Sequence, residues 1–470
     1  MTPYEAVKEE FDFPFELRPF QVTEVIDLSE FHRAGFYWEP GAGKTVGSIV
    51  WALYHMLTQG VNYWICPMPP ILTLQWARFI GRIRYKRTGQ PLSALVYEGT
   101  PAKRAKLDLD HTFILMSYGL LKNDQRILSA AFDGVKYGVI ADEAHAIKNI
   151  ESQTHRTVRD MAEDRPLALL TGTPLTTPGD AYAYMKLIAP GVYRNHRQFE
   201  NIHVQERDEY DKVTKWQNLE LLATNMKVHA SRVLRREVIN DLPPVIFTKI
   251  DYDLDPAHLK LYNRIADEQL VEFEDGREIN AISAQALRAA LQQIIVNYGE
   301  FADDDSLEPA ALTLIHEVFE EIGPTAKLAV VAHFVRSNAY LVRKLKQYGV
   351  VAIYGDVSPS NKQKAIARFI DDPSCRCILL QPASAGFGVD GLQHVCSDML
   401  VLEAPTISPP FDQVVKRLDR DGQTQPVNCR VAVANKTVQV RMFKSLLEND
   451  ATVNAVQGGF KDLKDMIHGN

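Results

Sequence analysis

Two blocks of the chain alternate short apolar runs with longer amphipathic ones. In the first block the apolar runs are rich in β-branched or aromatic residues and end in small or polar ones: residues 61–67, 112–118, 137–142 and 167–172. Runs of this kind are typical of buried strands, and segments with a helical pattern, such as residues 45–60, lie between them. Strands that alternate with helices predict a parallel sheet covered by helices.

The second block repeats this alternation further along the chain. Four runs are predicted as strands: residues 327–334, 350–355, 375–382 and 398–405. Residues 337–349 and 360–371 between them have helical patterns. From about residue 197 to 325 the sequence is charged and helical in pattern, with an acidic stretch at 299–309 that we expect to be a solvated connector. The prediction is therefore an α/β chain with two helix-covered sheets and a helical region between them.

Composition places few further limits on the chain. Its 470 residues suggest two to four domains at roughly 150 residues each. The net charge of -7 does not indicate a nucleic-acid partner, although a basic groove can lie in an acidic protein. Five scattered cysteines lack zinc spacing, and no apolar run reaches the about 18 residues of a membrane span. We expect a soluble, cytoplasmic protein with reduced thiols and no signal peptide.

The stretch GFYWEPGAGKTVG, residues 35–47, ends like a phosphate-binding loop. Such a loop needs small residues whose backbone N–H groups point inward, with a helix N-terminus behind them. Three small residues are present: Gly41, Ala42 and Gly43. Lys44 would reach the β- and γ-phosphates of ATP, and Thr45 would hold Mg²⁺. Trp38 stands where the general pattern has glycine, so from this stretch alone a chance Gly-Lys-Thr turn stays open.

A pair of acids follows a predicted strand about 100 residues later. In VIADEAHAIKN, residues 139–149, an apolar run delivers Asp142 and Glu143 at its carboxyl end. Asp142 can hold Mg²⁺ directly or through water, and Glu143 can polarise an attacking water. Acid pairs at strand ends are common, but their position after a Gly-Lys-Thr loop favours nucleotide chemistry.

The Asp-Glu-Ala-His sequence at 142–145 resembles the second motif of superfamily 2 helicase-like ATPases. The other motifs of that superfamily have counterparts in the same order, at residues 17–21, 65–80, 114–121, 170–177, 384–392 and 413–423. Within the first of these, Gln21 corresponds to the adenine-recognising glutamine. The resemblance covers about residues 17 to 425.

The sixth motif resembles that of the Swi/Snf-type branch of the superfamily. Its matching residues are Gln413, Arg417, Arg420, Gly422 and Gln423. That branch reads Glu-Met-Gly-x-Gly-Lys-Thr at the phosphate loop, and Glu39-Pro40 followed by GAGKT resembles it with proline in place of methionine. Because the branch does not require the first glycine, Trp38 no longer counts against the loop. Residues 232–244 also resemble the branch's Arg-rich segment before Leu-Pro-Pro.

The resemblance implies two RecA-like lobes with ATP bound in the cleft between them. We expect an N-terminal ATP-binding lobe at 1–240, a helical connector at 241–325 and a C-terminal lobe at 326–470. Repeated opening and closing of the cleft would step the lobes along a nucleic-acid strand.

The resemblance also implies roles for particular residues. The expected catalytic residues are Lys44, Glu143, Arg417 and Arg420. The expected ATP-binding residues are Gln21, Gly41, Ala42, Gly43, Lys44, Thr45, Gly388 and Asp390, with Thr45 and Asp142 holding Mg²⁺. The residues expected to couple ATP to nucleic acid are His145, Thr171, Gly172, Thr173 and Gln413.

Three positions depart from the family pattern. Phe387 and Asp390 stand where the fifth motif often has glycine and asparagine, and Thr177 stands where many members carry asparagine. Other contacts stay open from the sequence. The basic segment at 78–87 is either a DNA-binding surface or a solvated helix face, and Trp38 and Trp76 are expected in the core rather than stacked on bases.

The implied activity is that of an ATP-dependent DNA translocase or helicase. Branch migration, annealing, fork remodelling and unwinding are all compatible with it, on duplex, forked or single-stranded DNA. The alternatives are an RNA-stimulated helicase of the same superfamily, a nucleotide-gated interaction switch that does not translocate, and a restriction-type motor subunit. We expect a compact, monomeric bacterial or bacteriophage enzyme, nucleoid-associated in a bacterial or virus-infected cell, with replication or recombination proteins as candidate partners.

Overall fold

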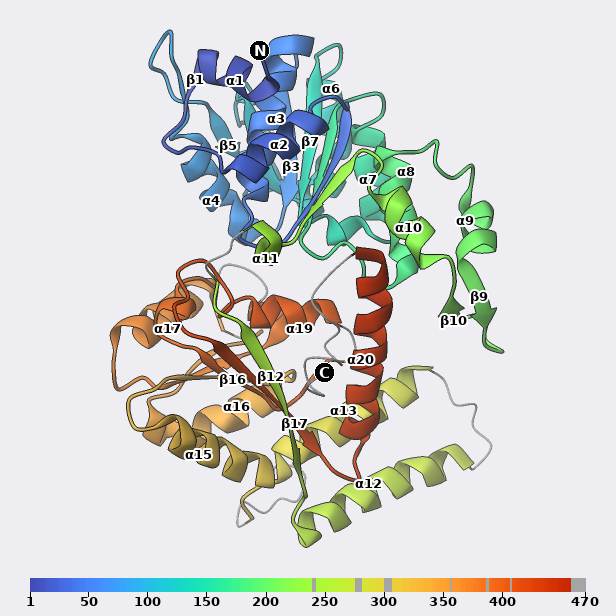
Figure 1. Cartoon of the computed structure of the whole chain (residues 1–470), viewed down its shortest axis with the longest axis vertical. Coiled ribbons are helices and arrows are strands. Elements are labelled where there is room, and N and C mark those ends of the chain that lie inside the picture. The colour runs from blue at the N-terminus through green and yellow to red at the C-terminus, as the bar shows by residue number, and fades with distance from the viewer. Residues whose placement is uncertain are drawn as a thin grey trace. The chain divides into compact units, whose positions relative to one another are not determined.

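A computed structural model describes residues 1–238, 242–274, 281–299, 307–355, 357–385, 389–405 and 408–457. The chain divides into two compact units (Figure 1). The first comprises Met1–Asn240 with Thr452–Gly459, and the second comprises Asp241–Ala451 with Phe460–Asn470. Among the described residues, no helix combines the length and the apolar character that a membrane span requires.

The first unit is built on a seven-stranded sheet in which every pair of neighbours is parallel. In spatial order its strands are β11 (Ala230–Val233), β2 (Arg33–Trp38), β8 (Leu167–Leu170), β7 (Tyr137–Asp142), β3 (Tyr63–Met68), β6 (Phe113–Ser117) and β5 (Ala94–Val96). The four apolar runs predicted as strands in the first block are β3, β6, β7 and β8. The predicted parallel α/β arrangement is therefore confirmed.

Helices cover both faces of this sheet because successive strand residues point to opposite sides. On β7, for example, Val139 belongs to one core cluster and Ile140 to the other. One face packs against α1 (Pro3–Glu10), α2 (Pro19–Leu28), α3 (Lys44–Gln59) and α4 (Pro70–Ile80). The other packs against α6 (Tyr118–Ala131), α7 (Gln153–Met161), α8 (Ala181–Ile188) and α10 (Leu219–Met226).

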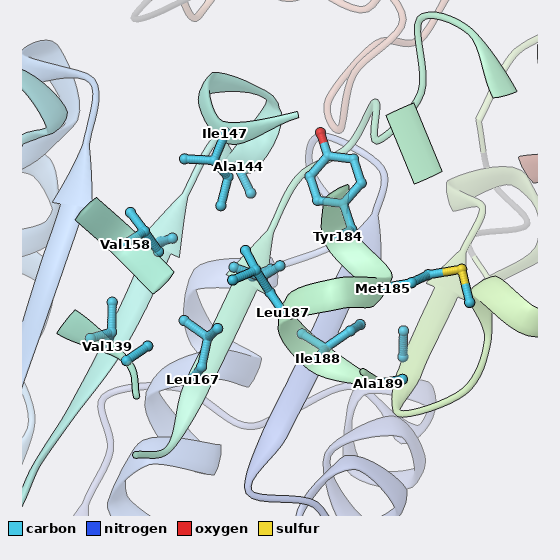
Figure 2. Packing of buried hydrophobic residues seen from close by; sticks show 14 of the residues in the cluster. Val139, Ala144, Ile147, Val158, Leu167, Tyr184, Met185, Leu187, Ile188 and Ala189 are labelled. Carbon is cyan, nitrogen blue, oxygen red and sulfur yellow. The ribbon is translucent and has the colours of Figure 1, made fainter. Parts of the chain in front are cut away.

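Figure 2 shows part of the second of these cores. Val139 of β7 and Leu167 of β8 lie on the side of the sheet that carries Leu187 and Ile188 of α8. The remaining short helical elements of the unit are α5 (Pro101–Arg104), η1 (Ala144–Ile147), η2 (Pro178–Asp180), α9 (His196–His203) and α11 (Arg235–Val238).

Two small antiparallel sheets complete the first unit. Strand β1 (Phe11–Asp12) pairs with β4 (Arg84–Tyr85), and β9 (Val204–Arg207) pairs with β10 (Val213–Trp216). With α9, the β9–β10 hairpin projects from the rest of the unit (Figure 1). Our prediction that residues 197–325 are helical was wrong for this hairpin and for β11. The hairpin strands are largely solvent-exposed, so they carry charges and lack the apolar alternation that identifies a half-buried strand.

The second unit contains a six-stranded sheet, again with only parallel neighbours. Its spatial order is β12 (Val245–Tyr252), β17 (Val427–Ala434), β16 (Asp398–Val401), β13 (Leu328–Val331), β15 (Cys377–Leu380) and β14 (Val351–Ile353). The four strands predicted in the second block are β13, β14, β15 and β16, which confirms the second helix-covered sheet.

The range expected as a helical connector, 241–325, begins with a strand. Strand β12 pairs with β17 along its whole length, from Val245 opposite Val427 to Tyr252 opposite Ala434 (Figure 1). The connector is therefore not helical throughout, because β12 is an edge strand of the second sheet. The three-part domain division stays a prediction. Most of the acidic stretch at 299–309 lies outside the described residues.

Helices also cover the second sheet. Those that begin in this unit are α12 (Pro256–Glu274), α13 (Ala281–Val296), α15 (Ala310–Ile322), α16 (Val335–Lys344), α17 (Pro359–Asp371), α18 (Pro382–Ala385), α19 (Ser408–Val415) and α20 (Val438–Gln457), with the short η3 (Lys346–Tyr348) and η4 (Leu392–His394). The helical predictions at 337–349 and 360–371 correspond to α16 with η3 and to α17. All five cysteines are free and buried.

Candidate nucleotide site

The predicted phosphate loop joins the end of β2 to the start of α3. Both Gly41 and Gly43 have positive φ angles, 87° and 86°, which side chains other than glycine rarely adopt. A Cβ atom added to Gly43 would also lie 2.2 Å from Nε2 of Gln21. The backbone at Gly43 is therefore approached so closely that glycine is required there for both its conformation and its size.

Gln21 fastens the loop to helix α2. Its Nε2 donates a hydrogen bond to the carbonyl of Ala42 at 2.9 Å, and its Oε1 accepts one from the backbone N–H of Arg18 at 2.8 Å. The side chain is buried. Gln21 thus links the N-terminus of α2 to the phosphate loop, and its adenine-recognising role stays a prediction.

Helix α3 begins directly after the loop, at Lys44. The first N–H groups of a helix have no partners within the helix, and they carry a partial positive charge that favours anions such as phosphate. Nζ of Lys44 donates to the carbonyl of Trp38 at 2.9 Å. Trp38 itself is fully buried, which confirms its predicted place in the core. The loop, the helix N-terminus and the lysine therefore form the arrangement that a nucleotide phosphate needs.

Asp142, the last residue of β7, is held by two hydrogen bonds. Its Oδ1 accepts from the backbone N–H of Glu143 at 2.8 Å, and its Oδ2 accepts from Nε1 of Trp76 at 3.0 Å. The residue is 5% exposed. Burial, followed by the charge of Glu143, raises the pKa of Asp142 to about 6, against the lowering effects of Lys44 and of both hydrogen bonds. Trp76 is likewise buried, as predicted.

Glu143 occupies a left-handed backbone conformation, with φ of 52°. Such conformations in residues other than glycine persist only where the surroundings enforce them, and they are frequent at functional sites. The next element, η1, is anchored by Ala144 and Ile147, which are buried in the core (Figure 2). Tyr118 also donates its hydroxyl to the carbonyl of Asp142 at 2.8 Å. This turn directs Glu143 out of the strand, and its side chain stays partly exposed.

His145 contacts the predicted catalytic acid. Its Nδ1 lies 3.3 Å from Oε2 of Glu143, and both side chains are partly exposed. His145 is therefore not a buried core residue. Its coupling role stays a prediction.

The predicted coupling segment follows β8, which lies between β2 and β7 in the sheet. The N–H of Thr173 donates to Oγ1 of Thr171 at 3.2 Å. A Cβ atom added to Gly172 would lie 2.6 Å from Cδ of Pro40, so this segment packs against the phosphate loop. Ligands in parallel α/β sheets bind beyond the carboxyl ends of the strands. The phosphate loop, the acid pair and the Thr171–Thr173 segment meet at that edge in the first unit.

The fifth and sixth motifs are joined to each other within the second unit. Arg417 is largely buried, and its Nη1 donates to the carbonyl of Val389 at 3.2 Å. Nε of Arg420 lies 3.4 Å from Oδ1 of Asp390. Gln413 lies on α19 and is partly exposed. Gly388 and Phe387 lie outside the described residues.

The residues of the first unit fit a nucleotide with Mg²⁺. The loop leaves no room for a side chain at Gly43, and the Thr45 hydroxyl and Asp142 carboxylate are the oxygen donors that Mg²⁺ prefers. No cluster of three or more His, Cys, Asp or Glu side chains suited to a metal occurs in the described part of the chain. Mg²⁺ commonly combines one or two protein ligands with phosphate oxygens, so this sparse donor set is compatible with a nucleotide-bound ion.

The sequence did not indicate two supports of Asp142. Trp76 and Tyr118 lie 66 and 24 residues from it along the chain, and both are ordinary aromatic residues in their local patterns. Only the tertiary fold brings them to the acid.

Two other features lie apart from these residues. The basic segment at 78–87 exposes Arg78, Arg82, Arg84, Lys86 and Arg87, and its role in binding DNA stays a prediction. A cavity of about 1170 Å³ lies in the second unit, lined mainly by residues of α12. None of the predicted site residues lines this cavity.

Comparisons with known proteins identify the family to which the chain belongs. The SNF2-related domain matches residues 36–298. An uncharacterized ATP-dependent helicase of Mycoplasma pneumoniae is 24% identical over 426 residues, covering 88% of this chain and 39% of its own length. The DNA annealing helicase and endonuclease ZRANB3 of Mus musculus is 25% identical over 477 residues, covering 95% of this chain and 41% of its own. The ATP-dependent DNA helicase DDM1 of Arabidopsis thaliana is 23% identical over 451 residues, covering 86% of this chain and 56% of its own length.

A solved structure is also similar to this chain. It is the Sulfolobus solfataricus SWI2/SNF2 ATPase core in complex with dsDNA, with a TM-score of 0.41 and 19% identity over 97% of each chain. The chain spans between about a quarter and just over half the length of the curated relatives it matches. The resemblance to the Swi/Snf-type branch is confirmed by the family match over residues 36–298, more than half of the sequence, and the chain belongs to the SNF2-related domain family.

Proposed function

We propose that this protein is a DNA-dependent ATPase that uses ATP hydrolysis to translocate on DNA. The observation that carries the proposal is that Lys44, Asp142 and Glu143 lie beyond the carboxyl ends of β2 and β7, two strands separated only by β8. The charges of Lys44 and Glu143 both act on the Asp142 carboxyl. These are the groups that phosphoryl transfer to water requires: a phosphate-binding cation, a metal-binding acid and an acid that orients water.

Each group has a distinct task in the proposed reaction. Lys44 and the loop N–H groups bind the β- and γ-phosphates. Thr45 and Asp142 would hold Mg²⁺, which when bound neutralises charge on the phosphate oxygens. Glu143 would accept a hydrogen bond from the attacking water and orient it toward the γ-phosphate. Its exposure at the turn after β7 leaves its carboxylate accessible to that water.

Arg417 and Arg420 would supply positive charge to the γ-phosphate in the transition state. Both belong to the second unit, whereas the phosphate loop belongs to the first. Hydrolysis would then depend on the second unit engaging the bound nucleotide, and loss of the γ-phosphate would weaken that engagement. This dependence would couple each ATP turnover to a relative movement of the units along DNA.

Family membership and the relatives' names support DNA rather than RNA as the partner. The printed names include a DNA annealing helicase, an ATP-dependent DNA helicase and a DNA repair and recombination protein. Branch migration, annealing, fork remodelling and unwinding are all forms of the proposed movement. We propose further that the enzyme acts as a monomer in the cytoplasm, on nucleoid DNA. An RNA-stimulated helicase and a non-translocating switch are the competing functions.

The proposal is tested by following ATP hydrolysis together with displacement of a third strand from a DNA triplex. Wild-type protein should displace the strand only with hydrolysable ATP. Lys44→Ala should lose both activities, whereas Arg159→Ala, which removes an exposed cation of α7, should retain both. Hydrolysis without strand displacement would contradict translocation, and hydrolysis retained by Lys44→Ala would contradict the site assignment.

A further inference from the structure

A second arginine-bearing segment runs beside the phosphate loop within the first unit. Strand β11 is the parallel neighbour of β2, and its last residue, Val233, pairs with Trp38 at the end of β2. Glu39, the next residue of the loop, donates its N–H to the carbonyl of Val233 at 3.0 Å. The two strands therefore end together, so the residues that follow β11 lie next to the phosphate loop.

Arg235 is fixed in this position through Glu39. The backbone N–H of Arg235 donates to Oε2 of Glu39 at 2.9 Å. Both residues are buried, with Arg235 3% and Glu39 4% exposed. Because Glu39 belongs to the loop itself, this hydrogen bond ties the loop to the start of α11.

The side chain of Arg235 lies along the loop at Gly41. A Cβ atom added to Gly41 would be 3.4 Å from both Cδ and Nη1 of Arg235 and 4.0 Å from Cζ. The guanidinium therefore lies within ordinary van der Waals distance of the space that a side chain at Gly41 would occupy, at the glycine whose φ is 87°. The cation that the sequence predicts for ATP binding is Lys44, which lies at the other end of the loop. Arg235 was not predicted as a nucleotide-binding residue.

The charges gathered here favour an anion. The N-terminus of α3, Lys44 and the Arg235 guanidinium contribute positive potential at the loop, which outweighs the single buried acid Glu39, whose Oε2 accepts from the backbone N–H of Arg235. A buried guanidinium is stabilised by oxygen acceptors, and its planar fork matches the oxygens of a phosphate group. A nucleotide phosphate bound in the loop would bring such oxygens next to Gly41.

We propose that Arg235 is a second phosphate-binding residue of this nucleotide site, contributed by the same unit as Lys44 and placed by the pairing of β11 with β2. This inference rests on the proposed ATPase function. It differs from the predicted roles of Arg417 and Arg420, which lie in the other unit. Arg235 would stabilise bound ATP in the ground state, before any arginine of the second unit takes part.

The test compares nucleotide binding by wild-type protein, Arg235→Gln and Arg235→Lys. ATP and AMP dissociation constants are measured with Mg²⁺ by competition against a fluorescent ATP analogue. Melting temperature is measured with and without ATP, because a ligand that binds the folded state raises it. Arg159→Ala is the matched control, since it removes an exposed guanidinium from the same unit.

Arg235→Gln should weaken ATP binding by about tenfold or more, the size expected for losing a charge-assisted hydrogen bond. AMP binding should change little, because AMP lacks the β- and γ-phosphates that lie in the loop. Arg235→Lys should recover part of the ATP affinity by keeping the charge, and Arg159→Ala should behave as wild type. The rise in melting temperature caused by ATP should be smallest in Arg235→Gln, intermediate in Arg235→Lys, and the same as wild type in Arg159→Ala.

A purely structural role for Arg235 would give a different result. The melting temperature without nucleotide would fall, ATP and AMP affinities would change by the same factor, and lysine would not restore the ATP preference. That outcome, or unchanged ATP affinity in Arg235→Gln, would overturn the inference while leaving the proposed function in place. Wild-type protein that neither binds nor hydrolyses ATP would overturn the proposed function and this inference together.

Discussion

The indole Nε1 of Trp76 donates a hydrogen bond to Oδ2 of Asp142 across 3.0 Å. This bond joins a core side chain of α4 to the acid predicted to hold Mg²⁺. Mutation of an outer residue that orients a metal-binding carboxylate commonly lowers metal affinity by about 10- to 100-fold. Trp76 therefore links the packing of one face of the sheet to the chemistry at its edge.

Replacing Trp76 with phenylalanine should weaken metal-assisted nucleotide binding. The Trp76→Phe substitution keeps an aromatic ring but removes the donor to Asp142, at a cost of about 1 kcal/mol in stability. We expect the gain in ADP affinity on adding Mg²⁺ to fall by about tenfold, measured by calorimetry with and without the ion.

The matched control for this substitution is Trp64→Phe. Trp64 is a fully buried tryptophan of β3 whose Nε1 has no hydrogen-bond partner within the described residues. The Trp64→Phe variant should lose a comparable amount of packing, but its gain in ADP affinity on adding Mg²⁺ should equal that of wild type. An equal Mg²⁺ effect in wild type and Trp76→Phe would show that the indole bond does not tune the metal ligand.

The raised pKa of Asp142 predicts a pH-dependent contribution to stability. Burial and the charge of Glu143 raise this pKa to about 6. The protonated acid therefore stabilises the fold fully below its ordinary pKa, and this contribution is lost as pH rises through about 6. Asp142→Asn stays neutral at all these pH values. Its free energy of unfolding should therefore rise by about 1–3 kcal/mol relative to that of wild type between pH values of about 4.5 and 7.5.

Urea denaturation at several pH values measures this difference directly. Asp160→Asn is a suitable control, because Asp160 lies in an exposed ion pair with Arg159. If the difference in unfolding free energy between wild type and Asp142→Asn stays constant across this pH range, Asp142 titrates normally in the folded protein.

Alanine at Gly43 should disrupt the phosphate loop for two reasons. The φ of 86° disfavours any side chain, and the new Cβ atom would meet Nε2 of Gln21 at 2.2 Å. Gln21 would have to release the carbonyl of Ala42. We expect Gly43→Ala to raise the KM for ATP by at least about tenfold, in line with the loss of ordered loop N–H donors.

Gly134→Ala separates backbone strain from loop disruption. Gly134 has a φ of 68° with nothing within 4 Å of an added Cβ atom. This control should lose about 1 kcal/mol of stability and keep its KM. Comparable KM values for Gly43→Ala and wild type would rule out the loop as the nucleotide site.

Arg420→Ala should slow hydrolysis while sparing ATP binding. A transition-state arginine contributes about 10³-fold or more to turnover in related phosphoryl-transfer enzymes. The ATP dissociation constant and kcat are measured on the same preparation, with Arg368→Ala as control because Arg368 lies in an exposed pair on α17. Parallel losses of binding and turnover in Arg420→Ala would argue against the transition-state role.

The core strands of both sheets could be predicted because their apolar runs are short and clearly bounded. The edge strand β12 could not. Its burial alternates only over its first residues, and it begins within a charged stretch whose pattern suggests helix. Pairing with β17, about 180 residues later in the chain, determines its structure. Such distant pairing leaves little local signal in the sequence.

The nucleotide-site residues could be predicted from motif spacing, whereas their supports could not. The sequence placed Gln21 near a nucleotide base, but its bond to Ala42 follows from how α2 packs on the loop. The left-handed turn at Glu143 is followed by Ala144 and Ile147, which are buried in the core. These contacts depend on tertiary packing rather than on local residue patterns.

The steady-state rate of ATP hydrolysis across a panel of nucleic acids tests the central claim most directly. The same protein would be assayed without nucleic acid and with single-stranded, duplex and forked DNA and RNA, at matched phosphate concentrations. A DNA translocase should be stimulated strongly by duplex or forked DNA and much less by RNA. Hydrolysis that is stimulated only by RNA, or that is the same with every nucleic acid and without any, would contradict the proposed function.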